Sequence, residues 1–214
     1  MKIKNIALVG NPNCGKTSLF NTLTGTRQKV ANYAGVTVER KEGSFNLPSG
    51  DAIRVLDLPG TYSLKPSSLD EEVTRAVCLG ELKGEILPDI FICVVDATNL
   101  SLHLSLVLEV RALNRPMILV LNMMDEVKKR GISIDKDKLS QLLGIPVVEA
   151  VAVKTKGIQD LINQLDQKNL FITPYHSELS HFEQVKQITK QVILNNDNGD
   201  KRTAFLDKIF LHPV

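Results

Sequence analysis

The sequence has few cysteines and little net charge, and both shortages exclude classes of protein. Its three cysteines, Cys14, Cys78 and Cys93, are too widely spaced to form a metal-binding or disulfide pattern, which fits a reducing cytosol. The four histidines are scattered and form no ligand-like pair. A formal net charge of +2 provides no large cationic surface, so we expect no nucleic-acid partner.

Long apolar runs are also absent. No run reaches the roughly 18 residues that a bilayer-spanning helix needs, and no secretory signal pattern is present. The 214 residues are 43% hydrophobic and 23% charged, which is ordinary for a folded soluble domain. We therefore expect a soluble chain, long enough for one α/β domain and a small appendage, that can belong to a larger protein.

What is present begins with the segment 10–17, which fits the phosphate-binding pattern G-x-x-x-x-G-K-[ST]. A strand-like segment at 3–9 precedes it, and a helix-like segment at 18–24 follows. The glycines allow backbone N–H groups to approach crowded phosphate oxygens, and the helix N-terminus adds a positive dipole end. The expected nucleotide contacts are Gly10, Asn11, Pro12, Asn13, Cys14, Gly15, Lys16, Thr17 and Ser18.

Individual roles within this loop follow from chemistry. Lys16 would bring its charge to the β- and γ-phosphates, and Thr17 would give its hydroxyl to Mg²⁺. Cys14 is expected to face outward and to be a neutral filler rather than a nucleophile.

Strand-like and helix-like stretches alternate up to residue 166. Six strands are predicted, at 3–9, 36–47, 52–57, 89–96, 116–122 and 146–148, with five helices between and after them. This alternation predicts an α/β fold: a mostly parallel six-stranded sheet flanked by helices, with its ligand beyond the carboxyl ends of the strands. Residues 26–36 have no clear period and are predicted to be a loop.

Residues 167–214 differ from the rest and are predicted to form a small helical appendage. Apolar residues recur at helical spacing in 182–193 and in 205–210, on either side of a polar break, and there is no strand signal. The expected domains are therefore 1–166 and 167–214.

The segment Asp57-Leu58-Pro59-Gly60 follows a predicted strand about 40 residues after Lys16. In a nucleotide hydrolase, Asp57 would hold Mg²⁺ through water and the Gly60 N–H would reach the γ-phosphate. Thr37 is the best candidate for a threonine that closes over Mg²⁺. Many related hydrolases have a water-orienting glutamine after the glycine, whereas this chain has Thr61, so intrinsic hydrolysis should be slow.

A second set of residues indicates guanine. Asn122-Met123-Met124-Asp125 follows a buried strand, and the Asp125 carboxylate can accept from both donors of a guanine edge. Met123 stands where lysine is usual, and its thioether can still pack along the base. The alternative is that Asp125 only caps a helix. Val151, Ala152 and Val153 occupy the place of a further base-binding loop, with Ala152 offering its N–H to guanine. Together these motifs predict a guanine-nucleotide switch domain of the P-loop GTPase fold.

Three of these motifs and a further segment carry a resemblance to a family. Residues 10–17, 32–39 (Asn-Tyr-Ala-Gly-Val-Thr-Val-Glu), 57–64 (Asp-Leu-Pro-Gly-Thr-Tyr-Ser-Leu) and 122–125 resemble the N-terminal cytoplasmic GTPase domain of the FeoB-type ferrous iron transporters. The resemblance covers residues 1–166, and the tail at 205–214 is similar to the stretch before that family's first membrane helix.

The resemblance implies a GTP- and Mg²⁺-dependent hydrolase coupled to Fe²⁺ uptake, at the cytoplasmic face of the bacterial inner membrane. It implies switch segments at 26–41 and 57–70, with Gly35, Val36 and Thr37 near the nucleotide, and a helical segment that tunes GDP release. It also implies a K⁺ ion held partly by Asn11 that offsets developing charge. The catalytic set would then be Lys16, Thr37, Gly60 and Asn11. Implied partners are the transporter's own transmembrane domain, a second copy of the chain and small cytosolic accessory proteins.

Other functions compete with this one. A soluble RNA- or ribosome-associated GTPase of the same superfamily would carry the same motifs, although the low charge disfavours it. A P-loop ATPase or kinase would lack the guanine-reading role of Asp125. A passive scaffold would bind nucleotide without turnover. Nothing in the sequence resembles an Fe²⁺ site.

Overall fold

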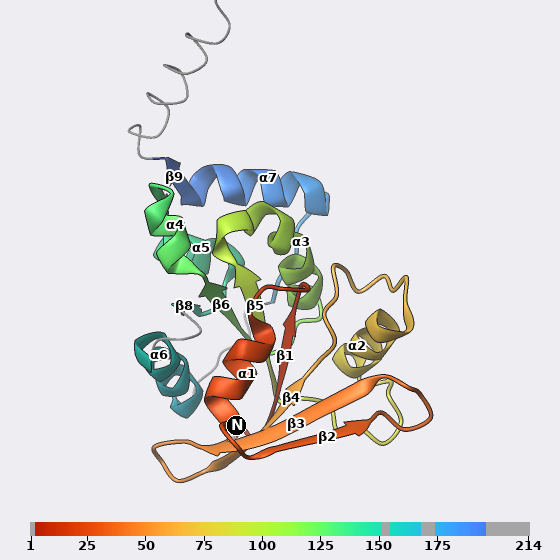
Figure 1. The fold of residues 1–214 in the computed structure, drawn as a ribbon. Coiled ribbons are helices and arrows are strands. Elements are labelled where there is room, and N and C mark those ends of the chain that lie inside the picture. Colours follow the sequence, from red (N-terminus) through yellow and green to blue (C-terminus); the bar gives the residue numbers. More distant parts are fainter. Residues whose placement is uncertain (1–2, 151–154, 168–173, 196–214) are drawn as a thin grey trace, which may run out of the picture.

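The computed structural model describes residues 3–150, 155–167 and 174–195. Figure 1 shows a sheet with helices on both sides. Its strands are β1 (Asn5–Gly10), β2 (Gln28–Asn32), β3 (Glu39–Asn46), β4 (Ala52–Asp57), β5 (Ile90–Asp96), β6 (Met117–Asn122) and β8 (Val147–Glu149). The helices are α1 (Lys16–Thr24), α2 (Leu69–Leu79), α3 (Leu100–Arg111), α4 (Met124–Lys129), α5 (Lys136–Leu143), α6 (Thr155–Asp166) and α7 (His181–Val192), with a short 3₁₀ turn at Ala97–Asn99.

The sheet has the strand order β2-β3-β4-β1-β5-β6-β8. Only β3 pairs in antiparallel fashion, with β2 and β4, and the other pairs are parallel. Strands β5 and β6 are almost wholly buried because helices cover both faces, which explains their unbroken apolar sequence. The predicted α/β class and mostly parallel sheet are confirmed.

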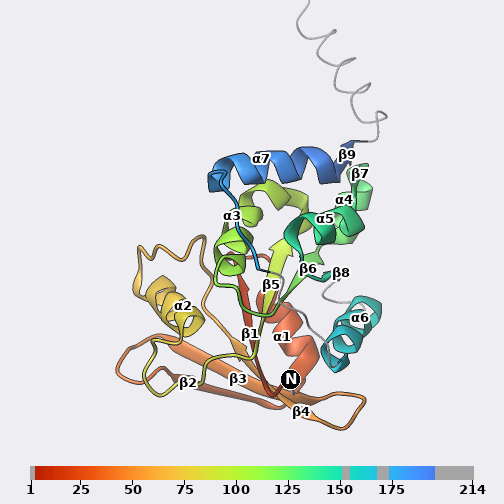
Figure 2. The same ribbon diagram turned by 180° about the vertical axis from the view of Figure 1, so that it is seen from behind.

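Two apolar cores lie on the two faces of the sheet. Helices α1 and α6 contribute to one core, while α2, α3 and α5 contribute to the other. Helix α7 packs on α3 and α5, and its Ile188 and Val192 belong to that second core. Figure 2, seen from behind, shows α7 lying across this side of the molecule. Among the helices described, none is both long and apolar enough to cross a membrane.

The sheet has seven strands, and the prediction of six was wrong because residues 26–36 are not all loop. They contain β2, which pairs with β3 at the edge of the sheet. Every residue of β2 is exposed, so no alternation of buried and exposed side chains marks it in the sequence.

A second small sheet was also missed. Strand β7 (Ile132–Ile134) pairs in antiparallel fashion with β9 (Ile193–Asn195), and α4 precedes β7. The prediction that 167–214 contains no strand was therefore wrong, because β9 is only three residues long and directly continues the apolar stripe of α7. The predicted stripe at 205–210 lies outside the described residues, and the domain division at 166 stays a prediction.

Candidate functional site

The loop between β1 and α1 is shaped by two glycines that have no room for a side chain. A Cβ atom on Gly10 would lie 2.4 Å from the carbonyl oxygen of Val94, on the neighbouring strand β5. Gly15 has a left-handed backbone (φ +88°), and a Cβ atom there would lie 2.0 Å from Nδ2 of Asn122. The glycines thus permit close packing behind the loop, which leaves its front free for a ligand.

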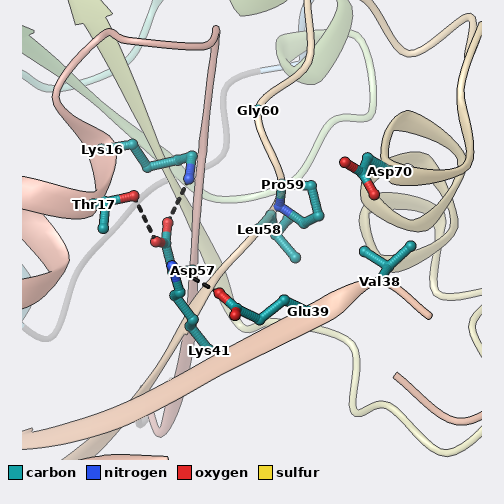
Figure 3. A pocket seen from close by; sticks show the side chains of 10 residues that line it. All are labelled: Lys16, Thr17, Val38, Glu39, Lys41, Asp57, Leu58, Pro59, Gly60 and Asp70. Atoms are coloured by element: carbon teal, nitrogen blue, oxygen red, sulfur yellow. Dashed lines mark hydrogen bonds and ion pairs between the residues drawn. The ribbon is translucent and has the colours of Figure 1, made fainter. Parts of the chain in front are cut away.

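The first residues of α1 meet the end of β4. The Lys16 ammonium lies 2.5 Å from Oδ1 of Asp57, and the Thr17 hydroxyl donates to Oδ2 of the same carboxylate at 3.0 Å. Figure 3 shows both side chains directed at Asp57. Lys16 is 8% exposed and Asp57 is 5% exposed, so this is a largely buried ion pair with both carboxylate oxygens bonded. Three residues predicted to act together from separate motifs are therefore in contact.

Two cavities open around this group. One, of about 260 Å³, is lined by Lys16, Thr17, Val38, Glu39, Lys41, Asp57, Leu58, Pro59, Gly60 and Asp70. The other, of about 580 Å³, is lined by Asn11, Pro12, Asn13, Gly15, Lys16, Thr17, Ser18, Gly60, Asp70 and Met123. They have Lys16, Thr17, Gly60 and Asp70 in common, so they form one continuous site along the phosphate loop. The second cavity reaches from the loop to Met123, where a base is expected.

Three charged residues in the site, Glu39, Lys41 and Asp70, were missed by sequence reasoning. Lys41 enters because the register of β3 and β4 places it opposite Asp57. Its ammonium lies 2.8 Å from Glu39, and this hydrogen bond raises the pKa of Lys41. Asp70, in the first turn of α2, lines both cavities. Strand register could have suggested Lys41, whereas the placement of Asp70 depends on the path of the loop before α2.

Asn11 lines the larger cavity but is only 2% exposed. Within the part of the chain that the structure describes, neither its amide nitrogen nor its amide oxygen has a hydrogen-bond partner. A buried amide without partners is costly, so its oxygen and nitrogen are available to a bound group.

The base-binding residues are only partly assembled. The Nδ2 atom of Asn122 donates to the carbonyl oxygen of Cys14 at 2.9 Å, so the Asn122 side chain holds the phosphate loop from behind. Asp125 is half-buried in the first turn of α4. It is not the cap of that helix, because the N-cap residue is Met123, which has a left-handed backbone (φ 60°). Val151, Ala152 and Val153 lie outside the described residues.

Cys14 does not face outward, and that expectation was wrong. Its side chain is fully buried in the core beneath α1, and burial raises the pKa of its thiol. A buried thiol with a raised pKa is a poor nucleophile, so the interpretation as a neutral filler agrees with the structure.

Thr37 is not among the residues that line the two cavities. It is exposed in the turn between β2 and β3, as is Gly35, while Val36 is half-buried. Among the described residues, the smaller cavity is lined by the next two in sequence, Val38 and Glu39, rather than by Thr37. The predicted segment is therefore adjacent to the site, but this structure does not bring the Thr37 side chain into it.

Thr61 cannot take the place of a water-orienting glutamine. Its side chain is fully buried, and its hydroxyl donates to the carbonyl oxygen of Ser63 at 2.6 Å. Its backbone N–H donates to the carbonyl oxygen of Gly10 at 3.2 Å, which fixes the chain after Gly60 against the phosphate loop.

A strand, a glycine loop and a helix, with a lysine and a threonine meeting an aspartate from the neighbouring strand, define a P-loop nucleotide-binding domain. The family model described as "Ferrous iron transport protein B" matches residues 4–165. The chain belongs to this FeoB family of ferrous iron transport proteins, and its fold is that of the family's GTPase domain.

Relatives and solved structures agree with this assignment. The Fe(2+) transporter FeoB of Salmonella typhimurium is 46% identical over 188 residues, which are 86% of this chain and 23% of that protein. The Escherichia coli protein is 45% identical with the same coverage. The chain thus spans about a quarter of the length of these curated relatives.

Among solved structures, the cytosolic domain of L. pneumophila FeoB matches with a TM-score of 0.81 and 32% identity, over 90% of this chain and 100% of that one. The GMPPNP form of the T. maritima FeoB cytosolic domain matches with a TM-score of 0.76 and 34% identity, over 90% and 100% of the two chains. A GDP-bound point mutant of the S. thermophilus FeoB G-domain has a TM-score of 0.70 and 38% identity, over 82% and 64%.

Proposed function

We propose that this chain binds GTP and hydrolyses it to GDP and phosphate as the cytoplasmic domain of a ferrous iron transporter. The observation that carries the proposal is the contact of Lys16 and Thr17 with Asp57 at the floor of the phosphate cavity. In the absence of nucleotide the Lys16 ammonium neutralises Asp57. With nucleotide bound, Lys16 would turn to the β- and γ-phosphates, and Asp57 would be free to help hold Mg²⁺ through water.

The donor set fits Mg²⁺, because a threonine hydroxyl and a carboxylate that holds water are oxygen donors suited to this hard cation. Thr17 would bind the ion directly and Asp57 through water, with Thr37 joining after the β2–β3 turn rearranges. Bound there, Mg²⁺ would neutralise charge on the β- and γ-phosphate oxygens. The Gly60 N–H would meet the γ-phosphate, and Lys16 would stabilise the charge that develops on it.

The two unpartnered amide atoms of Asn11 support a K⁺ site beside the phosphates. The amide oxygen would be a ligand, and the ion would supply positive charge in place of an arginine finger. Because Thr61 is buried and hydrogen-bonded, the chain has no glutamine-like water-orienting group at that position. Hydrolysis would therefore depend more strongly on the positive charge of the K⁺ ion.

The base is read by Asp125, whose carboxylate accepts from guanine, with Met123 along the ring. The predicted base-binding loop of Val151, Ala152 and Val153, with the Ala152 N–H offered to guanine, lies outside the described residues. Of the remaining residues of the set, Cys14 and Asn122 support the phosphate loop from behind. The others, Gly10, Pro12, Asn13, Gly15, Ser18, Gly35 and Val36, would shape the surface around the nucleotide.

We further propose that GTP turnover is coupled to Fe²⁺ uptake by the transporter's transmembrane domain, at the cytoplasmic face of the bacterial inner membrane. Residues 167–214 would lead toward that domain and tune GDP release, with a second copy or small accessory proteins as further partners. The family match favours this function over an RNA- or ribosome-associated GTPase.

Phosphate release from GTP and from ATP, each measured with and without Mg²⁺, tests the proposal. We expect slow, Mg²⁺-dependent release from GTP and at least about a hundredfold less from ATP, because adenine lacks the donor pair that Asp125 accepts. Equal release from both nucleotides would contradict the guanine assignment. Binding of GTP without any release would favour the passive scaffold.

A further inference from the structure

Glu109, near the end of α3, accepts hydrogen bonds from the loop that follows Gly60. The Ser63 hydroxyl lies 3.0 and 2.9 Å from the two oxygens of this carboxylate and donates a hydrogen bond to it. The backbone N–H of Leu64 donates to the same group at 2.5 Å. Glu109 is separated from these residues by 45 or 46 positions, so no local preference of the chain creates the contact. A carboxylate bonded to a hydroxyl and a backbone N–H forms strong, charge-assisted hydrogen bonds.

Helix α3 is a fixed support for this carboxylate. Its residues Leu106, Val107, Leu108 and Val110 are no more than 1% exposed. Arg111, two residues after Glu109, is 1% exposed, and its Nε donates to the carbonyl oxygen of Leu143 at 3.0 Å. A helix held on several sides cannot follow a moving loop, so a displacement of residues 63–64 must break their bonds to Glu109.

The residues directly before and after Gly60, Pro59 and Thr61, are both hydrogen-bonded to other parts of the chain. The carbonyl oxygen of Pro59 accepts from the Thr74 hydroxyl at 2.9 Å, and the N–H of Thr61 donates to the carbonyl oxygen of Gly10. Beyond Thr61 the loop reaches the surface, since Tyr62 is 53% exposed. The Tyr62 N–H donates to Glu71 of α2 at 3.4 Å, and the contact with Glu109 is the following hydrogen-bonded tie, which joins the loop to α3. It therefore limits how far the chain after Gly60 can move away from the cavities that Gly60 lines.

We propose that Glu109 is a positioning residue for Gly60 and that it favours binding of a nucleoside triphosphate over a diphosphate. The inference rests on the proposed function, in which the Gly60 N–H meets the γ-phosphate. GDP has no γ-phosphate, so its affinity depends little on where this N–H lies. By holding Ser63 and Leu64, Glu109 reduces the conformational freedom that the loop would otherwise lose when a triphosphate binds.

The test is the ratio of the dissociation constants for GDP and for a non-hydrolysable GTP analogue, measured on the full chain with Mg²⁺. We expect Glu109→Ala to weaken binding of the analogue about tenfold and to change GDP affinity by no more than about twofold. Glu109→Gln should restore part of the preference, because its amide oxygen can still accept from Leu64. Ser63→Ala should weaken analogue binding about threefold and should add little to Glu109→Ala, since both changes remove the bond between Ser63 and Glu109 and the further bond that Ser63 accepts from the Lys65 N–H is exposed to water.

The control is Glu81→Ala, which removes an exposed carboxylate that pairs with Arg75 on the surface and should leave the ratio unchanged. Parallel losses of GDP and analogue affinity in Glu109→Ala, or an unchanged ratio, would overturn the inference. If Glu109→Ala does not fold, the ratio of dissociation constants measured for Ser63→Ala tests the inference instead, because this change leaves α3 intact. A wild-type chain that binds neither nucleotide would overturn the proposed function together with this inference.

Discussion

The side-chain amide of Asn122 donates a 2.9 Å hydrogen bond to the carbonyl oxygen of Cys14, joining two segments that are 108 residues apart. Asn122 ends β6 and begins the predicted base-reading loop, while Cys14 lies in the phosphate loop. Asn122 is 4% exposed and Cys14 is fully buried, so water cannot replace this bond. The two halves of the nucleotide site are thus fixed to each other before any ligand arrives.

Asn122→Ala should weaken binding of both GTP and GDP. The buried carbonyl oxygen of Cys14 would lose its partner at a cost of about 1–3 kcal/mol. In the variant the nucleotide itself would have to order the loop, so this cost corresponds to roughly five- to 150-fold in affinity. Titration with a fluorescent guanine nucleotide measures the effect, and Asn163→Ala on the exposed face of α6 is the matched control. Unchanged affinities would mean that the bond does not organise the loop.

Asp125→Asn should weaken guanine nucleotides selectively. The variant replaces a charge-assisted acceptor by a neutral amide, so we expect roughly ten- to a hundredfold weaker GTP binding. Equilibrium titration with GTP and ATP tests this, because ATP affinity should change little. Asp160→Asn, an exposed aspartate of α6, controls for the loss of one negative charge. Wild-type GTP affinity in Asp125→Asn would remove Asp125 from the base site.

Asn11→Ala should abolish the preference for potassium. We expect the wild-type chain to hydrolyse GTP faster in KCl than in NaCl of equal concentration, and the ratio of the two rates to fall to about one in the variant. Steady-state phosphate release in the two salts is the measurement. Asn46→Ala, at the end of β3 and outside both cavities, should keep the wild-type ratio. Equal wild-type rates in both salts would contradict the K⁺ site.

Acid should destabilise the sheet through a cluster of two arginines and two glutamates. Arg54 and Arg40 hydrogen-bond to Glu42 and lower the pKa of its carboxyl. Burial raises the pKa of Glu85, but bonds from Arg40 at 2.7 Å and Arg54 at 2.6 Å outweigh burial and leave it lowered. Because the pKa of both glutamates is lower in the folded than in the unfolded chain, the cluster stabilises the fold fully above the unfolded pKa, near about 4.3. This stabilisation is lost as the pH falls through the folded-state pKa values.

The free energy of unfolding in urea, measured from about pH 6 to about pH 3, should therefore fall more in the wild-type chain than in Glu42→Gln. We expect a difference of about 1 kcal/mol, because the cluster is partly exposed. Glu178→Gln, which changes an exposed glutamate, should follow the wild-type curve. Parallel pH curves for the wild type and Glu42→Gln would show that the cluster adds no pH-dependent stability.

The sequence predicted best the parts of the molecule where a local pattern has one physical meaning. The unbroken apolar runs at 89–96 and 116–122 predicted buried strands, and they form β5 and β6 in the centre of the sheet. The exposed edge strand β2 and the three-residue strands β7 and β9 could not be found in this way. Their existence depends on pairing with a distant partner rather than on a periodic burial pattern.

In the candidate site, too, local motifs predicted some features, whereas others depend on contacts between distant segments. The motifs at 10–17, 57–60 and 122–125 predicted by themselves that Lys16, Thr17 and Asp57 act together and that the fold is that of a P-loop domain, because the chemistry of a phosphate requires these residue types at this spacing. The structure confirms the fold and brings the three side chains into contact, and their binding of one ligand stays a prediction. Only the tertiary structure decided that Cys14 is buried, that Lys41 and Asp70 line the cavity and that Glu109 holds the loop after Gly60. Those relationships join separate elements through strand register and helix packing, and no short stretch of sequence specifies either.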